Sequence, residues 1–197
     1  MQNFRSLPLY QIRYTTNYMS GHNKWSQIKN KKGVTDAKRS KLFSMLVRMI
    51  TMEAKRAGGN KEAPSLKAAI IRAKDANMPL DNIERAVQKG FGGGAENFEE
   101  VTYEAYGPAG VALLITGVTD NKNRTTPEIK HILSEHGGSL GTQGSTAWAF
   151  TKDEEGNFVP QAMIPLSEAD QEKLSGLIEE IEEHEDIKNV FSNAELT

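Results

Sequence analysis

The 197-residue sequence contains no cysteine and no long apolar run. Without cysteine the chain has no disulfide bond, no thiolate zinc site and no cysteine nucleophile. A membrane-spanning helix needs at least about 18 consecutive apolar residues, and no stretch approaches that length. We therefore expect a protein without membrane contact that resides in a reducing compartment, the cytoplasm.

Residues that carry enzyme chemistry are also sparse. The four histidines fall on separate predicted elements, except that His131 and His136 share one helix at a spacing of five. A zinc pair needs a spacing of three or four on one helix face. No serine stands in a G-x-S-x-G motif, and no glycine-rich stretch has the lysine of a P-loop. We predict no enzyme, metal site, cofactor or small-molecule substrate, with one alternative open: a hydrolase that uses Ser145 in the glycine loop near Gly141.

Charge is distributed unevenly along the chain, although the formal net charge is only −2. Residues 1–90 contain 18 of the 24 lysines and arginines and 6 of the 26 acids, a balance of +12. The remainder contains 6 basic and 20 acidic residues, a balance of −14. This asymmetry predicts two modules, one of which suits a polyanionic partner.

The composition predicts four segments. Residues 1–18 contain no acid and lack an amphipathic pattern, so we expect an extension outside the fold, or alternatively a targeting peptide that would place the protein in mitochondria. Residues 19–90 form the basic helical domain, and residues 98–197 the acidic α+β domain. Three consecutive glycines within residues 91–97 predict a flexible linker between them.

Helical periodicity dominates the basic half. Apolar residues at positions 42, 46, 49, 50 and 57 predict a helix from Thr35 to Ala57. On its other face Lys41, Arg48 and Lys55 recur every seventh residue, about 10 Å apart along the helix axis. We call these three residues the basic row. Two further helices are predicted, one opening at Pro64 and one from Pro79 to about Lys89, with Gly90 as its stop.

Extended segments appear in the acidic half. The predicted elements are a hairpin of Val101–Tyr106 and Val111–Ile115, a helix from Thr126, a third strand with Thr146, Trp148 and Phe150 alternating, a helix after Ser167, and a last strand at Val190–Phe191. Two helices over an antiparallel sheet define an α+β, ferredoxin-like sandwich. The predicted fold is therefore a three-helix bundle followed by this sandwich.

The densest positive charge lies near the amino terminus, in Lys24, Lys29, Lys31, Lys32, Lys38, Arg39 and Lys41. Such cations release counterions when they neutralise phosphates, and Trp25 offers a ring on which a base can stack. No helix-turn-helix, zinc-finger or RNP signature accompanies them, so no motif supports reading of a base sequence. The alternatives are a solvated basic face and a structural role for Trp25 in the core.

Two other charged features leave alternatives open. The loop from Gly137 to Ser145 either holds an anion on its backbone N–H groups or simply connects a helix to a strand. The acids at positions 179, 180, 182, 183, 185 and 186 either form the solvated face of a helix or fold back on the basic domain and compete with its ligand.

Several collinear motifs resemble the YebC/PmpR family. They are Ser20 to Lys29 (SGHNKWSQIK), Asp36 to Arg39, Asn77 to Pro79, Ile83 to Ala86, Tyr103 to Pro108, Thr119 to Thr125 (TDNKNRT), His136 to Gly141 (HGGSLG) and Gly144-Ser145. The resemblance implies a non-enzymatic cytoplasmic DNA-binding protein that regulates transcription. The related mitochondrial translational activator of cytochrome c oxidase, and bacterial members linked to ribosome stalling, imply the alternative of a translation factor that binds ribosomal RNA.

The resemblance also adds Arg124, in the Thr119–Thr125 motif, as a contact from the second domain or as a loop-forming residue. The full candidate set for nucleic-acid binding is Lys24, Trp25, Lys29, Lys31, Lys32, Lys38, Arg39, Lys41, Arg48, Lys55 and Arg124. One departure is expected: family members carry a further α+β domain between the strand near Phe150 and Met163, where this chain has only residues 151–162.

Overall fold

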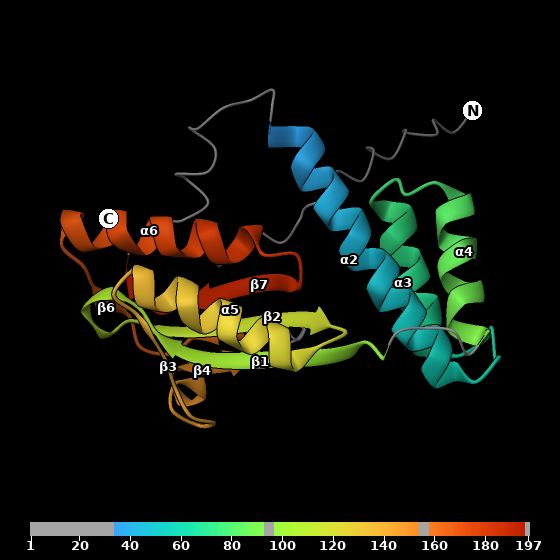
Figure 1. Cartoon of the computed structure of the whole chain (residues 1–197). Coiled ribbons are helices and arrows are strands. Elements are labelled where there is room, and N and C mark those ends of the chain that lie inside the picture. Colours follow the sequence, from blue (N-terminus) through green and yellow to red (C-terminus); the bar gives the residue numbers. More distant parts are fainter. Residues whose placement is uncertain (1–33, 93–96, 154–157, 196–197) are drawn as a thin grey trace, which may run out of the picture.

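The computed structural model describes residues 34–92, 97–153 and 158–195 (Figure 1). In chain order its elements are α2 (Val34–Ala57), α3 (Pro64–Asp75), α4 (Leu80–Phe91), β1 (Glu99–Tyr106), the 3-10 turn η1 (Pro108–Gly110), β2 (Ala112–Thr119), α5 (Lys122–Glu135), β3 (Ser139–Leu140), the 3-10 turn η2 (Ala147–Ala149), β4 (Phe150–Lys152), β5 (Phe158–Pro160), β6 (Ile164–Pro165), α6 (Glu168–Glu183), β7 (Ile187–Ser192) and β8 (Ala194–Glu195). This confirms the predicted α+β class. The predicted domain limits stay a prediction, with α4 ending at Phe91 and β1 beginning at Glu99.

In the first half of the chain, α3 and α4 pack against α2. Its buried residues Leu46, Ile50 and Ala54 contact Leu66 of α3 and Val87 of α4 in one apolar core. The predicted spacing of apolar residues is therefore confirmed at positions 46, 49, 50 and 57, which pack into apolar cores, whereas Leu42 is exposed. Removal of such side chains from water is the main stabilising contribution to a domain of this size.

Gly90 does not stop α4, as the sequence predicted, because the helix continues through it to Phe91. Gly90 is buried where α4 crosses α2. A Cβ at this position would lie 2.5 Å from the Cβ of Ala54 and 2.6 Å from the carbonyl oxygen of Thr51. The glycine is therefore needed for the close approach of two helices, not for a turn.

The second half contains a four-stranded antiparallel sheet in the order β3-β1-β2-β7. Strands β1 and β2 pair along their full length, from Glu99 with Thr119 to Tyr106 with Ala112, as the predicted hairpin requires. Helices α5 and α6 cover one face, where Ile129 and Leu177 pack against Leu113. Two helices over an antiparallel sheet were expected from the sequence.

The other face of the sheet is partly covered by the hairpin β4–β5. Phe150 and Phe158 of this hairpin pack with Leu114 of β2 and Phe191 of β7. The predicted third strand is wrong in its first half, because residues 147–149 form the turn η2 and only Phe150 begins a strand. Where the family resemblance places a whole domain, between Phe150 and Met163, the described residues form the rest of β4 and its partner β5.

The two halves contact each other through α2. Met45 and Met52 of α2 are buried together with Val118 at the end of β2, and Phe98 packs against them. Figure 1 shows α2, α3 and α4 side by side at one end of the sheet, with α2 nearest to it. The basic helices and the acidic domain therefore meet along one side of α2.

Candidate nucleic-acid interface

Of the eleven candidate residues, five lie outside the described residues: Lys24, Trp25, Lys29, Lys31 and Lys32. Their role in binding stays a prediction. Lys38 and Arg39 lie on the first turns of α2 and are exposed. The guanidinium of Arg39 lies 5.3 Å from the ring centre of Phe43, within the distance of a cation–π interaction.

Two of the three residues of the basic row, Lys41 and Arg48, are partly buried, and Lys55 is exposed. Lys41 is half-buried beside Glu182 and Glu183 at the end of α6. Burial lowers the pKa of Lys41, and the charges of the two glutamates offset part of that effect. Lys55, one turn from the other end of α2, donates a hydrogen bond to the Asn97 side chain. The seven-residue spacing does place the row on one face of α2, and the part of that face with Lys41 and Arg48 is turned toward the second domain.

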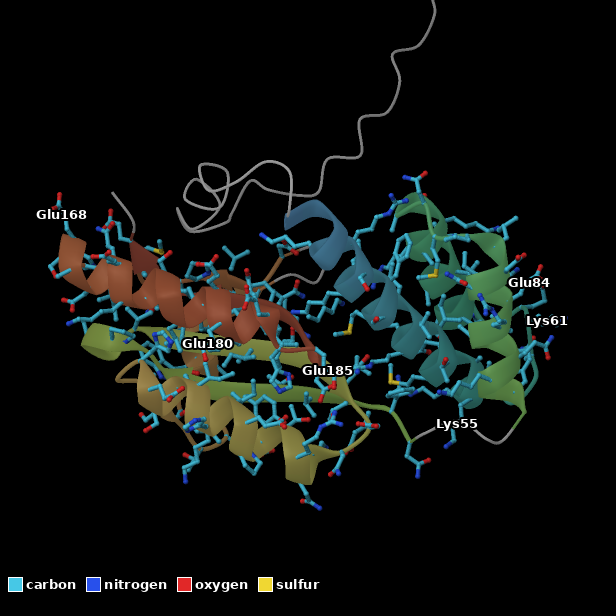
Figure 2. The ribbon with its side chains drawn as sticks, turned by 45° about the horizontal axis from the view of Figure 1, so that its top comes forward. Lys55, Lys61, Glu84, Glu168, Glu180 and Glu185 are labelled. Carbon is cyan, nitrogen blue, oxygen red and sulfur yellow. The ribbon has the colours of Figure 1, made fainter. Side chains whose placement is uncertain are left out.

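Arg48, the middle residue of the row, binds the corner where α6 leads into β7. Its Nη1 donates to the carboxylate of Asp186 and, at 2.8 Å, to the carbonyl oxygen of Glu185. Its Nη2 forms a 2.9 Å ion pair with the Glu185 side chain. Figure 2 shows Glu185 at this junction, whereas Lys61 and Glu84 lie on the far side of the helices. Arg48 therefore joins the two domains, and a direct phosphate contact would require this ion pair to open.

Asp186 is the centre of this junction, with a fully buried side chain. Besides Arg48, its carboxylate accepts hydrogen bonds from Arg124 Nη2 at 2.8 Å, Thr125 Oγ1 at 2.6 Å and Thr119 Oγ1 at 3.0 Å. Burial alone raises the pKa of Asp186, but these hydrogen bonds and the charge of Arg48 outweigh it, so the pKa lies below its ordinary value. Asp186 is thus a buried, ionised and fully bonded carboxylate.

The backbone also holds Asp186 in place. Its carbonyl oxygen accepts a 2.8 Å hydrogen bond from the Val118 N–H, and its own N–H donates to Nδ1 of His184 at 3.2 Å. Gly117 lies where this carbonyl crosses β2, and a Cβ there would collide with it. We call the group of Arg48, Arg124, Thr119, Thr125 and Asp186 the junction cluster.

Arg124 points into the junction cluster. The helix α5 begins four residues before the predicted Thr126, because the Asn121 side chain accepts a 3.0 Å hydrogen bond from the Asn123 N–H and caps it. Arg124 therefore lies in the first turn, where it also contacts Asp120 at 3.1 Å. The hydrogen bond with Asp186 is the main reason that the pKa of Arg124 is raised. Two roles were predicted for Arg124, a nucleic-acid contact and a structural role in the loop. The contacts with Asp186 and Asp120 support the structural role.

The glycine loop does bind an anion, but the anion is the chain's own Glu104. The buried Glu104 carboxylate accepts hydrogen bonds from the backbone N–H groups of Gly144, Thr146 and Ala147, at 2.6, 2.7 and 2.8 Å. Burial raises the pKa of Glu104, yet these hydrogen bonds outweigh it and the pKa is lowered. The loop is a helix-to-strand connection organised by a carboxylate. Because the backbone N–H groups of Thr146 and Ala147 donate to Glu104, these two residues do not pair with a strand, and β4 begins at Phe150.

The hydrolase alternative finds little chemistry in this loop. The Ser145 hydroxyl is buried without a hydrogen-bond partner among the described residues. The described histidines pair with glutamates in separate places, His136 with Glu180 at 2.6 Å and His184 with Glu128 at 3.0 Å. A serine nucleophile requires an accessible hydroxyl and an adjacent base.

Metal and membrane contacts are likewise without visible support. Within residues 34–92, 97–153 and 158–195, no group of three or more histidines and acids is arranged to hold a metal ion. None of the helices in those ranges is both long and apolar enough to cross a membrane.

Sequence reasoning missed Asp186 and Glu104, the two buried carboxylates. Asp186 is the last residue of an acidic run whose pattern is typical of the solvated face of a helix. The sequence feature that could have indicated its burial is its position directly before the buried Ile187 of β7. The alternative in which this acidic run meets the basic domain is correct in part. Glu182, Glu183, Glu185 and Asp186 face Lys41 and Arg48 of α2.

The fold and the junction cluster define a class: a basic helical domain fixed by ion pairs to an acidic α+β domain. Comparison with known proteins then gives the family. The family model described as "TACO1/YebC protein N-terminal domain" matches residues 23–93, and "TACO1/YebC second and third domain" matches residues 98–154. These matches cover more than half of the sequence. The chain belongs to the TACO1/YebC family.

Curated relatives agree with this assignment. A "Probable transcriptional regulatory protein" of Syntrophus aciditrophicus is 39% identical in an alignment 240 positions long, gaps included, that covers 90% of this chain and 96% of the relative. A protein of the same name from Desulfosudis oleivorans is 55% identical over 136 residues, 68% of this chain and 55% of the relative. The match to the second-and-third-domain model ends at residue 154, in the connection between β4 and β5.

A solved structure has the same fold. The crystal structure of a conserved hypothetical protein, Aq1575, from Aquifex aeolicus superposes with a TM-score of 0.77 at 33% identity. The match covers 88% of this chain and 97% of that chain.

Proposed function

We propose that this chain is a non-catalytic regulator of gene expression that binds nucleic acid through its basic amino-terminal half. The observation that carries this proposal is the division of charge, +12 in residues 1–90 against −14 in the remainder. The exposed cations Lys38, Arg39, Lys61 and Lys74 belong to this half and lie on or beside the described helices. The names of the relatives, transcriptional regulatory proteins, support the same role.

The phosphate backbone is the proposed target, because no motif for reading bases is present. Binding of this kind depends on the release of condensed counterions, so it weakens as salt rises. With about six phosphate contacts, affinity for duplex DNA should fall roughly 10³-fold between about 50 and about 200 mM salt. Fluorescence anisotropy with the full chain and a labelled duplex measures this directly. An affinity that does not change with salt contradicts the proposal.

Substitutions separate backbone contact from base reading. A variant with Lys31, Lys32, Lys38 and Arg39 changed to Gln should bind many unrelated sequences more weakly and to a similar degree. Lys130→Gln is the matched control, because Lys130 is an exposed lysine on α5 of the acidic domain. A loss confined to one sequence would instead indicate base readout.

Duplex DNA is the leading partner and ribosomal RNA the alternative, because both satisfy the same electrostatics. Co-sedimentation with ribosomes at moderate salt, compared with retention on promoter DNA, distinguishes a transcriptional from a translational regulator. The cytoplasm, or mitochondria if residues 1–18 direct import, stays the expected location. Catalysis is tested by assaying the purified chain for hydrolysis that disappears in a Ser145→Ala variant; we expect no turnover in either protein.

A further inference from the structure

Two aromatic side chains of the acidic half lie at the surface and not in a core. Trp148, in the turn η2, is 66% exposed, and Tyr106, at the end of β1, is 37% exposed. Tryptophan is highly buried on average, so an indole this open to water is unusual. Exposed apolar surface of this kind is typical of a place where a protein binds another molecule.

The two rings are neighbours, because both bond to one backbone oxygen. Nε1 of Trp148 donates to the carbonyl oxygen of Ser145 at 2.8 Å, and the hydroxyl of Tyr106 donates to the same oxygen at 2.9 Å. The indole has no other hydrogen-bond donor, and the tyrosine hydroxyl has used its only proton. The ring surfaces are therefore what these two side chains offer to a ligand. We call Trp148 and Tyr106 the aromatic pair.

The backbone holds both rings of the aromatic pair in place. Tyr106 pairs with β2 on one side and with β3 on the other. Trp148 directly follows Ala147, whose N–H donates to the buried carboxylate of Glu104 at 2.8 Å. A ligand that contacts the aromatic pair therefore has little loop or side-chain motion to suppress, and this favours binding.

The sequence around Trp148 carries no charge. Residues 137–151 contain no acid, lysine, arginine or histidine, although they belong to the half with a balance of −14. Apart from Trp148 itself, the exposed residues of this stretch are glycine, serine, threonine, glutamine and alanine. Within residues 97–153 and 158–195, the one other exposed large apolar side chain is Met163. The surroundings therefore carry neither the charges that would repel a phosphate chain nor the aliphatic surface that favours a protein partner.

An unpaired nucleobase matches these features. It is a flat, uncharged ring system that stacks on an aromatic side chain without a hydrogen-bond donor from the protein. We propose that Trp148 and Tyr106 form a stacking site for an unpaired base of the bound nucleic acid. The inference rests on the proposed function, because it assumes that the chain binds nucleic acid. It adds a contact outside the candidate set drawn from the sequence, in the half whose net charge is negative.

Two matched ligands isolate this contact. One is a blunt-ended duplex and the other is the same duplex with a single-stranded tail, each prepared as DNA and as RNA. The full chain should bind the tailed form more tightly, and Trp148→Ala should weaken that binding about 5- to 30-fold. A loss with either polymer supports the site and identifies the source of the base. Binding to the blunt duplex should change less than about twofold, because bases inside a duplex are not accessible to the rings and cations make the phosphate contacts.

Further substitutions separate stacking from a structural role. Trp148→Phe keeps an aromatic ring but loses the bond to Ser145, and Trp148→Leu keeps apolar bulk without a ring. Stacking predicts that Trp148→Phe retains most of the affinity for the tailed duplex and that Trp148→Leu loses it, with an unchanged salt slope because no phosphate contact is removed. Ile71→Ala is the control, because Ile71 on α3 is a 57% exposed apolar residue. Figure 1 shows β3 and β4, beside the aromatic pair, away from α3.

Fluorescence gives an independent measurement. The chain has two tryptophans, so Trp25→Phe leaves Trp148 as its single indole. Saturation of this variant with the tailed duplex should quench the indole fluorescence, because a base then lies on the ring, and the blunt duplex should quench it less. Equal quenching by the two ligands would contradict the proposal.

The outcomes separate the two proposals. If the wild-type chain binds neither the blunt nor the tailed duplex of either polymer, the proposed function and this inference both fail. If it binds both forms equally, or if Trp148→Leu behaves like Ile71→Ala, the stacking site is wrong and the proposed function stands. Equal losses for Trp148→Phe and Trp148→Leu would assign Trp148 a structural role. If Trp148→Ala abolishes self-association in sedimentation and leaves tailed-duplex binding unchanged, the rings are a protein contact and the inference is wrong.

Discussion

The guanidinium of Arg48 on α2 donates to the buried carboxylate of Asp186, which lies 138 positions further along the chain. A residue of the basic helical domain thereby satisfies a charge that is fully enclosed in the acidic domain. Because an uncompensated buried charge is strongly unfavourable, this contact favours one arrangement of the two domains. Arg48 of the basic row therefore connects the two domains and is not simply a cation exposed to solvent.

Arg48→Met should destabilise the protein by about 1 to 3 kcal/mol, because Asp186 and Glu185 then lose a charged hydrogen-bond donor. Urea unfolding followed by circular dichroism measures the change. Arg56→Met is the control, since the partner of Arg56 among the described residues is Glu53 on the same helix, and it should change stability by no more than about 0.5 kcal/mol. Equal effects of the two substitutions would rule out a special role for Arg48.

The protein should become less stable as the pH is lowered, because protonation of Asp186 weakens the junction cluster. The pKa of Asp186 is depressed in the folded protein, so the unfolded chain binds this proton more tightly. The carboxylate therefore stabilises the fold fully above the ordinary aspartate pKa of about 3.9, and this contribution is lost as pH falls through the lower folded value. Glu104 acts in the same direction.

The measurement is the free energy of unfolding between about pH 6 and about pH 3. The wild-type protein should lose stability over this range, and Asp186→Asn should lose less, because only the part due to Glu104 and other carboxylates remains. The charged groups near Asp186 are Arg48, Arg124 and Glu185, and the ring Nδ1 of His184 accepts a hydrogen bond from the Asp186 N–H. Parallel pH profiles for the two proteins would contradict the assignment.

Glu104→Gln should destabilise the acidic domain by about 2 to 4 kcal/mol. The amide has one acceptor oxygen in place of a carboxylate, and its NH2 group would face backbone donors at Gly144, Thr146 or Ala147. Glu100→Gln is a matched control on the same strand, with an exposed side chain. Thermal unfolding compares the two, and a similar melting temperature for both variants would show that the loop does not depend on Glu104.

Two glycines in helices should respond in opposite directions to alanine. Gly90→Ala places a Cβ against α2 and should destabilise the helical domain by about 1 to 3 kcal/mol. Gly176→Ala lies inside α6, where the nearest atom, of His136, is 3.6 Å from the new Cβ. It should stabilise the protein by about 0.5 to 1 kcal/mol, because alanine favours the helix. Chemical denaturation measures both, and a stabilising Gly90→Ala would show that the helices can separate at low energy.

Local patterns predicted most elements of the fold. The spacing of Leu174, Leu177, Ile178 and Ile181 predicted α6, and the apolar run after Gly110 predicted β2, because each pattern reflects burial of one face. The strand through Trp148 was wrong because a distant carboxylate, Glu104, engages the backbone that would have paired. Alternation along a short segment carries no information about such a partner.

The candidate site was less accessible to sequence reasoning. Periodicity correctly placed Lys41, Arg48 and Lys55 on one face of α2, but it could not show what that face meets. That information depends on how two domains pack, and it is fixed by contacts such as Arg48 with Asp186 that are far apart in sequence.

The most direct test of the proposed polyanion binding is the salt dependence of the full chain's affinity for duplex DNA. A plot of the logarithm of the binding constant against the logarithm of salt concentration should be linear, with a slope of about −5 for six phosphate contacts. A slope near zero, or no binding in dilute buffer to either DNA or structured RNA, would contradict the account.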